Sequence, residues 1–294
     1  MSKQDASVKT TFNLLNVKLR MPEAKEASQD DYVGLITQLA SRRIRATVTQ
    51  NIGVIMKRCI IERIGDNIML YGIITRYTPL TSGKLLNLEE PDQSEEDQEG
   101  LPINRVPNPK DVAFFFSPSN HRLAISKRGG PLSIKQAHDY FVKAFKQILK
   151  TGQLVDVDIE QDGDTFREIL DAPRIKRVRI EVSYTNNDMS KENAADLDQK
   201  MKSGNVGRFV IEAISDGATE GLDVAKIPFL QGAFELAQSN GKVSATVIDA
   251  KSPTKRGRTV ETEEHPREES VVSEKPGDVV RDMYAKLKNL FPRG

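Results

Sequence analysis

One stretch constrains the fold more than any other: residues 111–150, DVAFFFSPSNHRLAISKRGGPLSIKQAHDYFVKAFKQILK. Two apolar segments, 112–116 and 121–126, are separated by Ser-Pro-Ser-Asn, in which proline fits the first central position of a turn. The pattern predicts a β-hairpin. Its first strand is apolar on both faces, which is typical of a central strand rather than an edge strand.

A long amphipathic helix is predicted directly after this hairpin. Apolar residues recur at spacings of three and four over residues 134–148, which places them on one face. Ser133 and Gln136 form a capping box at the start of the helix. We therefore expect Phe141 and Phe145 to be buried against the first strand of the hairpin, where truncation to alanine costs ~3–5 kcal/mol.

The other segments predict an α+β fold, strand-rich in the N-terminal half and alternating between strands and helices in the C-terminal half. Pro266 interrupts a polar segment, 260–272, which is therefore expected to be an edge strand. The remaining elements are expected as strands at 11–19, 56–64, 68–78, 154–161, 174–184, 207–215 and 242–249, and as helices at 30–42, 164–171, 190–203, 226–239 and 278–291.

The length of 294 residues suits two domains. We expect a strand-rich domain at 1–150 and a tightly associated, alternating domain at 151–294. Residues 89–100, EEPDQSEEDQEG, contain seven carboxylates and no cation. Like charges together with proline and glycine favour an extended, mobile loop, so deletion of this segment is expected to leave thermal stability nearly unchanged.

Composition limits the possible partners and the compartment. The net charge is +1, so any nucleic-acid or membrane partner needs a local patch. The single cysteine, Cys59, excludes an intramolecular disulfide and is expected to be a buried small hydrophobe. The first residues, MSKQDASVKT, lack the apolar segment of a signal peptide, and no run is long enough to span a membrane. We expect a cytoplasmic protein without a cofactor.

Two segments alternate apolar and charged side chains. Residues 154–161 place Asp156, Asp158 and Glu160 on one face, an arrangement able to hold a divalent metal. Residues 174–184 place Arg177, Arg179 and Glu181 on the corresponding face. If the two strands are neighbours, their acidic and basic faces form cross-strand pairs, and we favour this interpretation over a metal site.

A first candidate ligand site follows the turn of the hairpin. His121 and Arg122 begin the second strand, and Lys127 and Arg128 close its far end. Alternation along the strand turns His121 toward apolar neighbours, which leaves Arg122 the freer side chain to bind a phosphate or carboxylate. We expect Arg122→Lys to weaken binding of an anion, and His121→Ala to reduce stability more than binding.

A second candidate site is a basic loop that contains Lys255, Arg256 and Arg258. Phosphates need cations without a particular geometry, so a non-enzymatic binding protein with a nucleic-acid ligand is our first hypothesis. A metal-dependent nuclease or other hydrolase that uses Asp156, Asp158 and Glu160, with His121 as a further candidate, is one alternative. A protein-interaction subunit of a larger system is the other. Salt-dependent oligonucleotide binding, metal-dependent cleavage or a co-purifying partner distinguishes the three.

Several pieces of the chain resemble an uncharacterised bacterial family known only as a domain of unknown function. They are SPSNHRL after the aromatic strand, RIKRVRIEVSYTNND, and AQSNGKVSATVID followed by Glu-Glu-His-Pro. The resemblance covers most of the chain and implies a bacterial protein from a mobile or phage-defence (antiviral) locus, without a known reaction. The elements that resemble a family signature are His121, Arg122, Leu123, His265 and Pro266.

Overall fold

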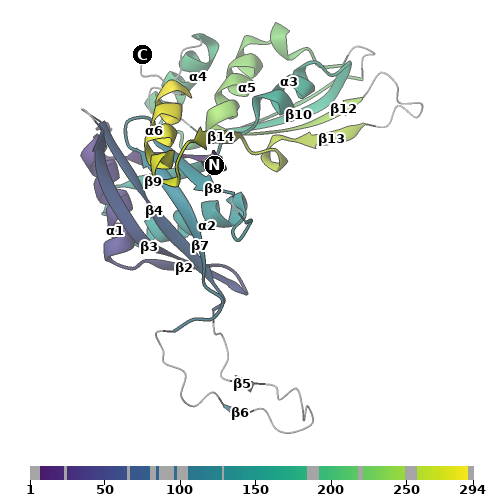
Figure 1. Ribbon diagram of the computed structural model, residues 1–294. Helices are drawn as coiled ribbons and strands as arrows, with labels where there is room; N and C mark the ends of the chain where they lie inside the picture. The colour runs from purple at the N-terminus through teal and green to yellow at the C-terminus, as the bar shows by residue number, and fades with distance from the viewer. Residues whose placement is uncertain are drawn as a thin grey trace, which may run out of the picture.

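Figure 1 shows a computed structural model of the chain, in which two β-sheets lie side by side and each carries helices. The structure describes residues 7–22, 25–64, 67–79, 84–85, 96–97, 105–127, 129–183, 192–217, 221–248 and 257–290. The expected α+β class with a strand-rich N-terminal half is confirmed. Most of the expected acidic loop, residues 89–95 and 98–100, lies outside the described residues.

The large sheet has eight strands, and its neighbours are antiparallel. The predicted hairpin lies in its middle, with β1 on one side and β4 on the other, so the expectation of a central strand is confirmed. The strands follow the order β14 (Glu268–Ser273), β1 (Val8–Arg20), β8 (Arg122–Ser126), β7 (Lys110–Ser117), β4 (Asn67–Tyr77), β3 (Ile52–Ile64) and β2 (Arg45–Thr49), with β9 (Leu154–Ile159) also paired to β1.

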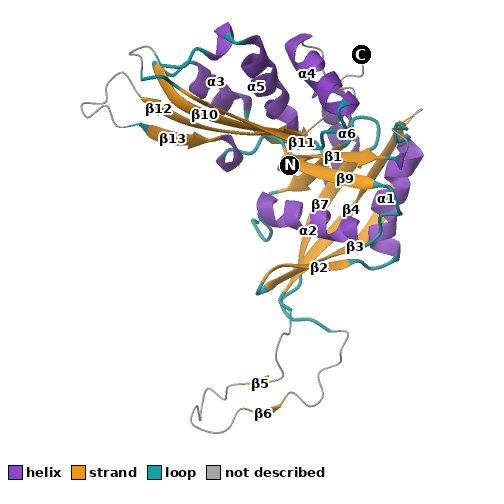
Figure 2. Ribbon diagram, turned by 180° about the vertical axis from the view of Figure 1, so that it is seen from behind, coloured by secondary structure: helices purple, strands orange, loops and turns teal. Residues whose placement is uncertain are grey.

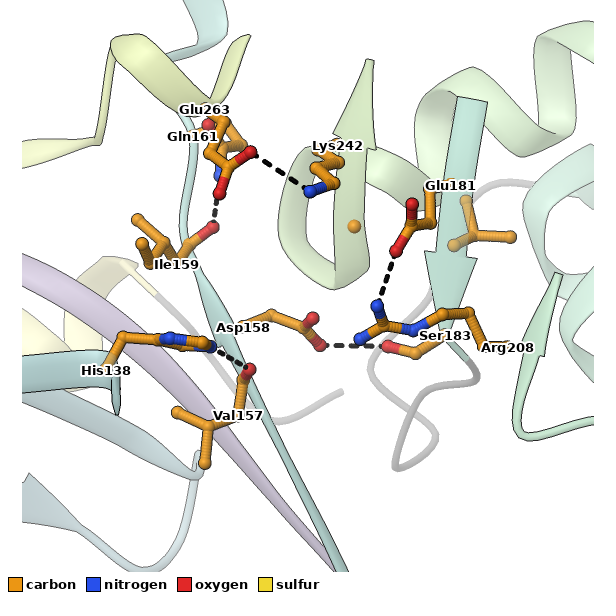
Figure 3. A pocket seen from close by; sticks show the side chains of 12 residues that line it. His138, Val157, Asp158, Ile159, Gln161, Glu181, Ser183, Arg208, Lys242 and Glu263 are labelled. Carbon is orange, nitrogen blue, oxygen red and sulfur yellow. Dashed lines mark hydrogen bonds and ion pairs between the residues drawn. The ribbon is translucent and has the colours of Figure 1, made fainter. Parts of the chain in front are cut away.

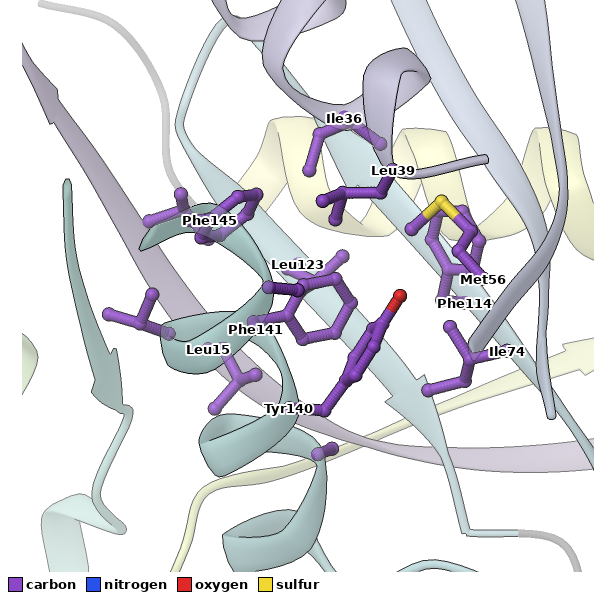
Figure 4. Close-up of a cluster of buried hydrophobic side chains, with 14 of the residues drawn as sticks. Leu15, Ile36, Leu39, Met56, Ile74, Phe114, Leu123, Tyr140, Phe141 and Phe145 are labelled. Atoms are coloured by element: carbon purple, nitrogen blue, oxygen red, sulfur yellow. The ribbon is translucent and has the colours of Figure 1, made fainter. Parts of the chain in front are cut away.

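Both faces of the large sheet are covered (Figure 1). Helices α1 (Gln29–Ser41) and α2 (Ile134–Lys146) pack on one face, and α6 (Val279–Leu290) packs on the other. The capping box that begins α2 is present. Phe141 and Phe145 are buried in the core that also contains Phe114 and Phe116 of β7, as expected (Figure 4).

The long strand β1 joins sequence-distant parts of the chain. Its first half pairs with β14 and its second half with β9, along the same edge, while β8 pairs with its other edge. Thus β9 and β14 are strands of the large sheet and α6 packs against it, although all three elements follow residue 150. The two sheets therefore divide the chain at other points than the expected boundary between 1–150 and 151–294.

The small sheet is an antiparallel, four-stranded sheet formed by one continuous part of the chain. Its α-helices lie on one face, and no α-helix of the described residues lies on the opposite face (Figure 2). The strand order is β11 (Arg208–Ile214), β10 (Arg174–Ser183), β12 (Gly241–Ile248) and β13 (Arg258–Glu261); the helices are α3 (Gly163–Leu170), α4 (Glu192–Ser203) and α5 (Pro228–Asn240).

The polar segment 260–272 is not one interrupted strand. Its first part is β13 of the small sheet and its second part is β14 of the large sheet, each at an edge. A 3-10 turn, Thr262–Glu264, separates them, and Pro266 forms an isolated bridge with Gln161. Proline lacks the N–H that a continuous ladder needs, so the chain leaves one sheet here and enters the other. Short 3-10 turns also occur at Val224–Lys226 and Pro276–Asp278, and β5 (Lys84–Leu85) pairs with β6 (Glu96–Asp97).

Candidate functional site

The histidine of the first candidate site is part of the hairpin turn. His121 has a φ of +60°, a left-handed conformation that histidine adopts more readily than most residues. Its ring stacks on Tyr32 of α1 with 4.5 Å between centroids, and only 8% of the residue is exposed. His121 therefore packs toward the α1 face, as its apolar neighbours in the strand predict.

Arg122 is not the freer side chain of the pair, which corrects the sequence-based expectation. Only 2% of Arg122 is exposed, and its guanidinium forms an ion pair with buried Glu160. Its Nη1 also donates to Asn16 Oδ1 at 3.0 Å and to the carbonyl of Asn120 at 2.8 Å. The sheet buries this residue completely, so Arg122 positions the strands around it and does not face solvent.

The remaining cations of the two predicted sites do not form one group. Lys127 forms an ion pair with Glu268 of β14, and Arg258 forms one with Glu168 of α3, where Arg258 Nη2 lies 2.7 Å from Glu168 Oε1. The other predicted ligand residues, Arg128, Lys255 and Arg256, lie outside the described residues.

Asp156 and Asp158 of β9 and Glu160, directly after it, project from one face, as expected, but each pairs with a cation of the large sheet. Asp156 binds Arg20 at 2.9 Å, Asp158 binds Lys18 at 2.6 Å, and Glu160 binds Arg122. We call these three pairs the charge ladder. The exposed fraction of the carboxylate side chains falls along the ladder from 26% to 11% and then 2%.

The ladder overturns the expectation that strands 154–161 and 174–184 are neighbours. β9 pairs with β1, whereas β10 pairs with β11 and β12 in the other sheet. The acid–base pairing itself is present, with β1 and β8 as the source of the cations. Since each carboxylate already holds a cation, and His121 lies on the opposite face, the proposed metal ligands do not converge. Within the described residues no group of three metal-ligating side chains occurs.

The ladder also connects the two sheets. Lys18 donates to Ser183 Oγ at the end of β10, and that hydroxyl donates to Asp158 Oδ2 at 2.8 Å. Burial by itself raises the pKa of Asp158, but the Lys18 ammonium and the hydrogen bonds from Lys18 and Ser183 outweigh it, so the pKa lies below its usual value. Asn16 Nδ2 reaches Asn240 Oδ1 of α5 at 3.0 Å.

A cavity of about 100 Å³ opens beside this connection, between β9 and the small sheet (Figure 3). Asp158, Glu181, Arg208, Lys242 and Glu263 are among the residues that line it. The walls pair internally: Arg208 binds Glu181, and Lys242 Nζ lies 3.0 Å from Glu263. Because these charges are paired with each other, the lining favours neither an anionic nor a cationic ligand. The volume accommodates only a few water molecules.

Two further side chains, His138 and Cys59, lie away from the predicted sites. His138 Nε2 lies 3.0 Å from the carbonyl of Val157 and its Nδ1 lies 3.0 Å from Asp139, so α2 and β9 are joined through its ring. Burial raises the pKa of the Cys59 thiol to about 12, which keeps it protonated and unreactive at neutral pH.

A basic group that sequence reasoning did not assemble lies on the small sheet. β10 begins with RIKRVR, four cations in six residues without an acid. Its first residue pairs with Ile248, the last residue of β12, so this stretch shares one end of the sheet with the start of β13. We call Arg174, Lys176, Arg177, Arg179 and Arg258 the basic end. The run RIKRVR was the available signal, but its cations were assigned to pairing with β9.

These features define a two-sheet α+β protein with a buried charge ladder and one open, charged sheet face. A family model described as "Domain of unknown function (DUF4747)" matches residues 8–289, and the chain belongs to this family. The match includes both sheets and all six helices from α1 to α6. No curated protein matches the chain. Among the described residues, no helix has the length and apolarity needed to cross a membrane.

Proposed function

We propose that the protein binds the phosphate backbone of a nucleic acid at the basic end of the small sheet. The observation that supports this proposal is the antiparallel pairing of β10 with β12, in which Arg174 lies opposite Ile248. It brings the run RIKRVR to the end where β12 leads into β13. In the sequence, the segment between β12 and β13 also contains Lys251, Lys255 and Arg256.

The ion pairs of the basic end leave positive charge in excess. Arg177 pairs with Glu212 of β11, and Arg258 pairs with Glu168. Within the described part of the chain, Lys176 and Arg179 form no ion pair with a carboxylate. Arg179 is exposed on the face of the sheet that has no helix. Exposed cations on a rigid strand are available to phosphates without any rearrangement of the fold.

The chemistry of this face favours binding that does not depend on sequence. The outward positions of β11 and β12 hold valine, isoleucine, serine and threonine beside the charged residues, and no aromatic side chain on which a base can stack. Guanidinium groups bind phosphate oxygens through paired N–H donors. We therefore expect electrostatic affinity that falls steeply with salt.

The test is fluorescence anisotropy with short single-stranded and double-stranded oligonucleotides between ~50 and ~200 mM salt. Two double variants carry the comparison: Lys176→Ala with Arg179→Ala at the basic end, and Arg58→Ala with Arg63→Ala on β3 of the large sheet as the control. Each removes two cations from a strand. Because each lost phosphate contact lowers the salt slope by about one, the first variant is expected to lose up to two units and the control none.

Two outcomes contradict the proposal. One is the absence of salt-dependent binding by the unchanged protein. The other is an equal loss of affinity in both double variants, which identifies a diffuse effect of net charge instead of a site. Circular dichroism of each variant verifies that the fold is retained.

A further inference from the structure

The outer edge of β11 is an unusual edge strand. It ends the small sheet, spans seven residues and pairs with β10 over all of them without a register shift. It contains no proline. Edge strands usually carry a bulge, a proline or a covering element, because an open edge is a template for another strand. In the described part of the structure none of these protects β11, and its edge carries only the charged side chains of Arg208 and Glu212 as a guard against pairing.

The edge strand β2 of the large sheet shows the contrast. Gln147 Nε2 donates to the carbonyl of Arg45 at 2.9 Å, and Lys143 Nζ donates to the carbonyl of Thr47 at 2.9 Å. Helix α2 thus satisfies backbone acceptors of β2 with its own side chains. In the described residues no side chain bonds the backbone of β11 in this way.

β11 carries apolar side chains on both faces, and on the face without helices they alternate with Arg208 and Glu212. On the face without helices, Val210 is 43% exposed and Ile214 is 66% exposed. On the helix face, Phe209 and Ile211 are half-buried and pack against the core of the small sheet. A strand added at this edge therefore covers apolar surface on both faces while it satisfies the open backbone groups.

We propose that a second copy of this chain pairs antiparallel with β11 across a two-fold axis at Val210. Residues opposite each other then have numbers that sum to 420. Val210 lies opposite Val210 of the partner subunit, and Phe209 lies opposite Ile211 of the partner subunit. Arg208 lies opposite Glu212 of the partner subunit, and the symmetry repeats each of these contacts, as in an isologous dimer.

The charges select this register over its neighbour. With the axis moved by one residue to Ile211, Arg208 lies opposite Ile214 and Val210 lies opposite Glu212 of the partner subunit, so both charges face apolar side chains. The register at Val210 instead adds two ion pairs. It also continues the diagonal pairs within each sheet, where Arg208 binds Glu181 and Glu212 binds Arg177.

This inference is independent of nucleic-acid binding, because the association state is measured without any ligand. The experiment uses analytical ultracentrifugation of the full chain over a concentration series. Arg208→Glu and Glu212→Arg each place like charges opposite each other twice in their own dimers. Each is expected to raise the dimer dissociation constant at least roughly tenfold. Arg58→Glu on β3 is the control that reverses one charge away from the edge.

An equimolar mixture of the two variants provides the decisive measurement. Arg208→Glu opposite Glu212→Arg restores two opposite-charge pairs, so the mixture is expected to form dimers that neither variant forms alone. A monomeric unchanged protein at the highest concentration overturns the proposal. So does normal dimerisation of either variant alone, or a mixture that stays monomeric while circular dichroism shows both variants folded.

Discussion

The charged faces of β9 and β10 share one sequence pattern and have opposite surroundings. Both strands alternate apolar and charged residues, with carboxylates on β9 and cations beside Glu181 on β10. The small sheet and α5 pack on the face of the large sheet that carries the charge ladder. There the Lys18–Asp158 and Arg122–Glu160 pairs are buried. No α-helix of the described residues covers the charged face of β10, and Arg177 and Arg179 are exposed.

The difference shows that the covering element, and not the pattern, sets what a charge contributes. A buried ion pair has lost its hydration, so it is tolerated only when its hydrogen bonds are complete. Removal of one partner strongly reduces the free energy of unfolding, because it leaves a buried charge without compensation. An exposed pair contributes about 0–1 kcal/mol, because water and salt screen it. The charges of β9 are therefore expected to hold the two sheets together, and those of β10 are available to a ligand.

The largest effect is expected from Arg122→Met. This change removes the close ion-pair partner of buried Glu160, while Arg267 lies at 3.6 Å, and is expected to reduce the free energy of unfolding by ~3–5 kcal/mol. The combined change with Glu160→Leu is expected to recover much of the loss, because no charge is then stranded. Urea unfolding of the two single variants and the double variant measures both. A loss below ~1 kcal/mol for Arg122→Met means that solvent reaches this pair.

A smaller effect, confined to acid, is expected from Asp158. Its pKa in the folded protein lies below the usual 3.8, because Lys18 and Ser183 favour the carboxylate despite its burial. A depressed pKa contributes stability that is fully present above the unfolded value and is lost as the pH falls through the folded value. We expect Asp158→Asn to flatten the loss of stability below the usual pKa, while Asp156→Asn, in the more exposed pair, changes it less. Identical acid profiles for the two variants contradict the difference in burial.

The smallest effect is expected from Arg179→Ala on the open face of β10. Exposed substitutions away from special features change stability by less than about 0.5 kcal/mol. Thermal unfolding of this variant beside Arg122→Met compares the two surfaces directly. If Arg179→Ala destabilises the protein by more than ~1 kcal/mol, the face is covered in solution and the comparison between the sheets fails.

Local sequence signals predicted the elements well because their causes are local. Three features depend only on residues that are close together in the sequence. They are the capping box at Ser133 and Gln136, the apolar spacing of α2 and the turn before His121. Burial of Phe141 and Phe145 followed from the same spacing. Alternation also predicted correctly which side chains of β9 share a face.

Strand neighbours and side-chain exposure were beyond these signals. Alternation states that Asp158 and Arg122 leave their strands on the polar face, but not that β1 lies between β8 and β9. Nor does it state that the small sheet closes over that face. Alternation therefore predicts that Arg122 is exposed to solvent, whereas contacts between segments distant in the sequence bury it. The basic end was missed for the same reason, since the pairing of Arg174 with Ile248 joins residues 74 positions apart.

The position of β14 has a consequence for the order in which the chain can fold during synthesis. The strands of the small sheet come from one uninterrupted segment, Arg174–Glu261, so this sheet can form while later residues are still in the ribosome. The first half of β1 can pair with β14 only after β14 has been synthesised. Its side chains Phe12 and Leu14 can pack against α6 only after α6 has been synthesised. Such long-range pairing folds slowly and leaves apolar surface exposed in the meantime. A nascent chain that stops before residue 268 can thus contain a complete small sheet, while the first half of β1 still exposes unpaired backbone groups and is prone to aggregation.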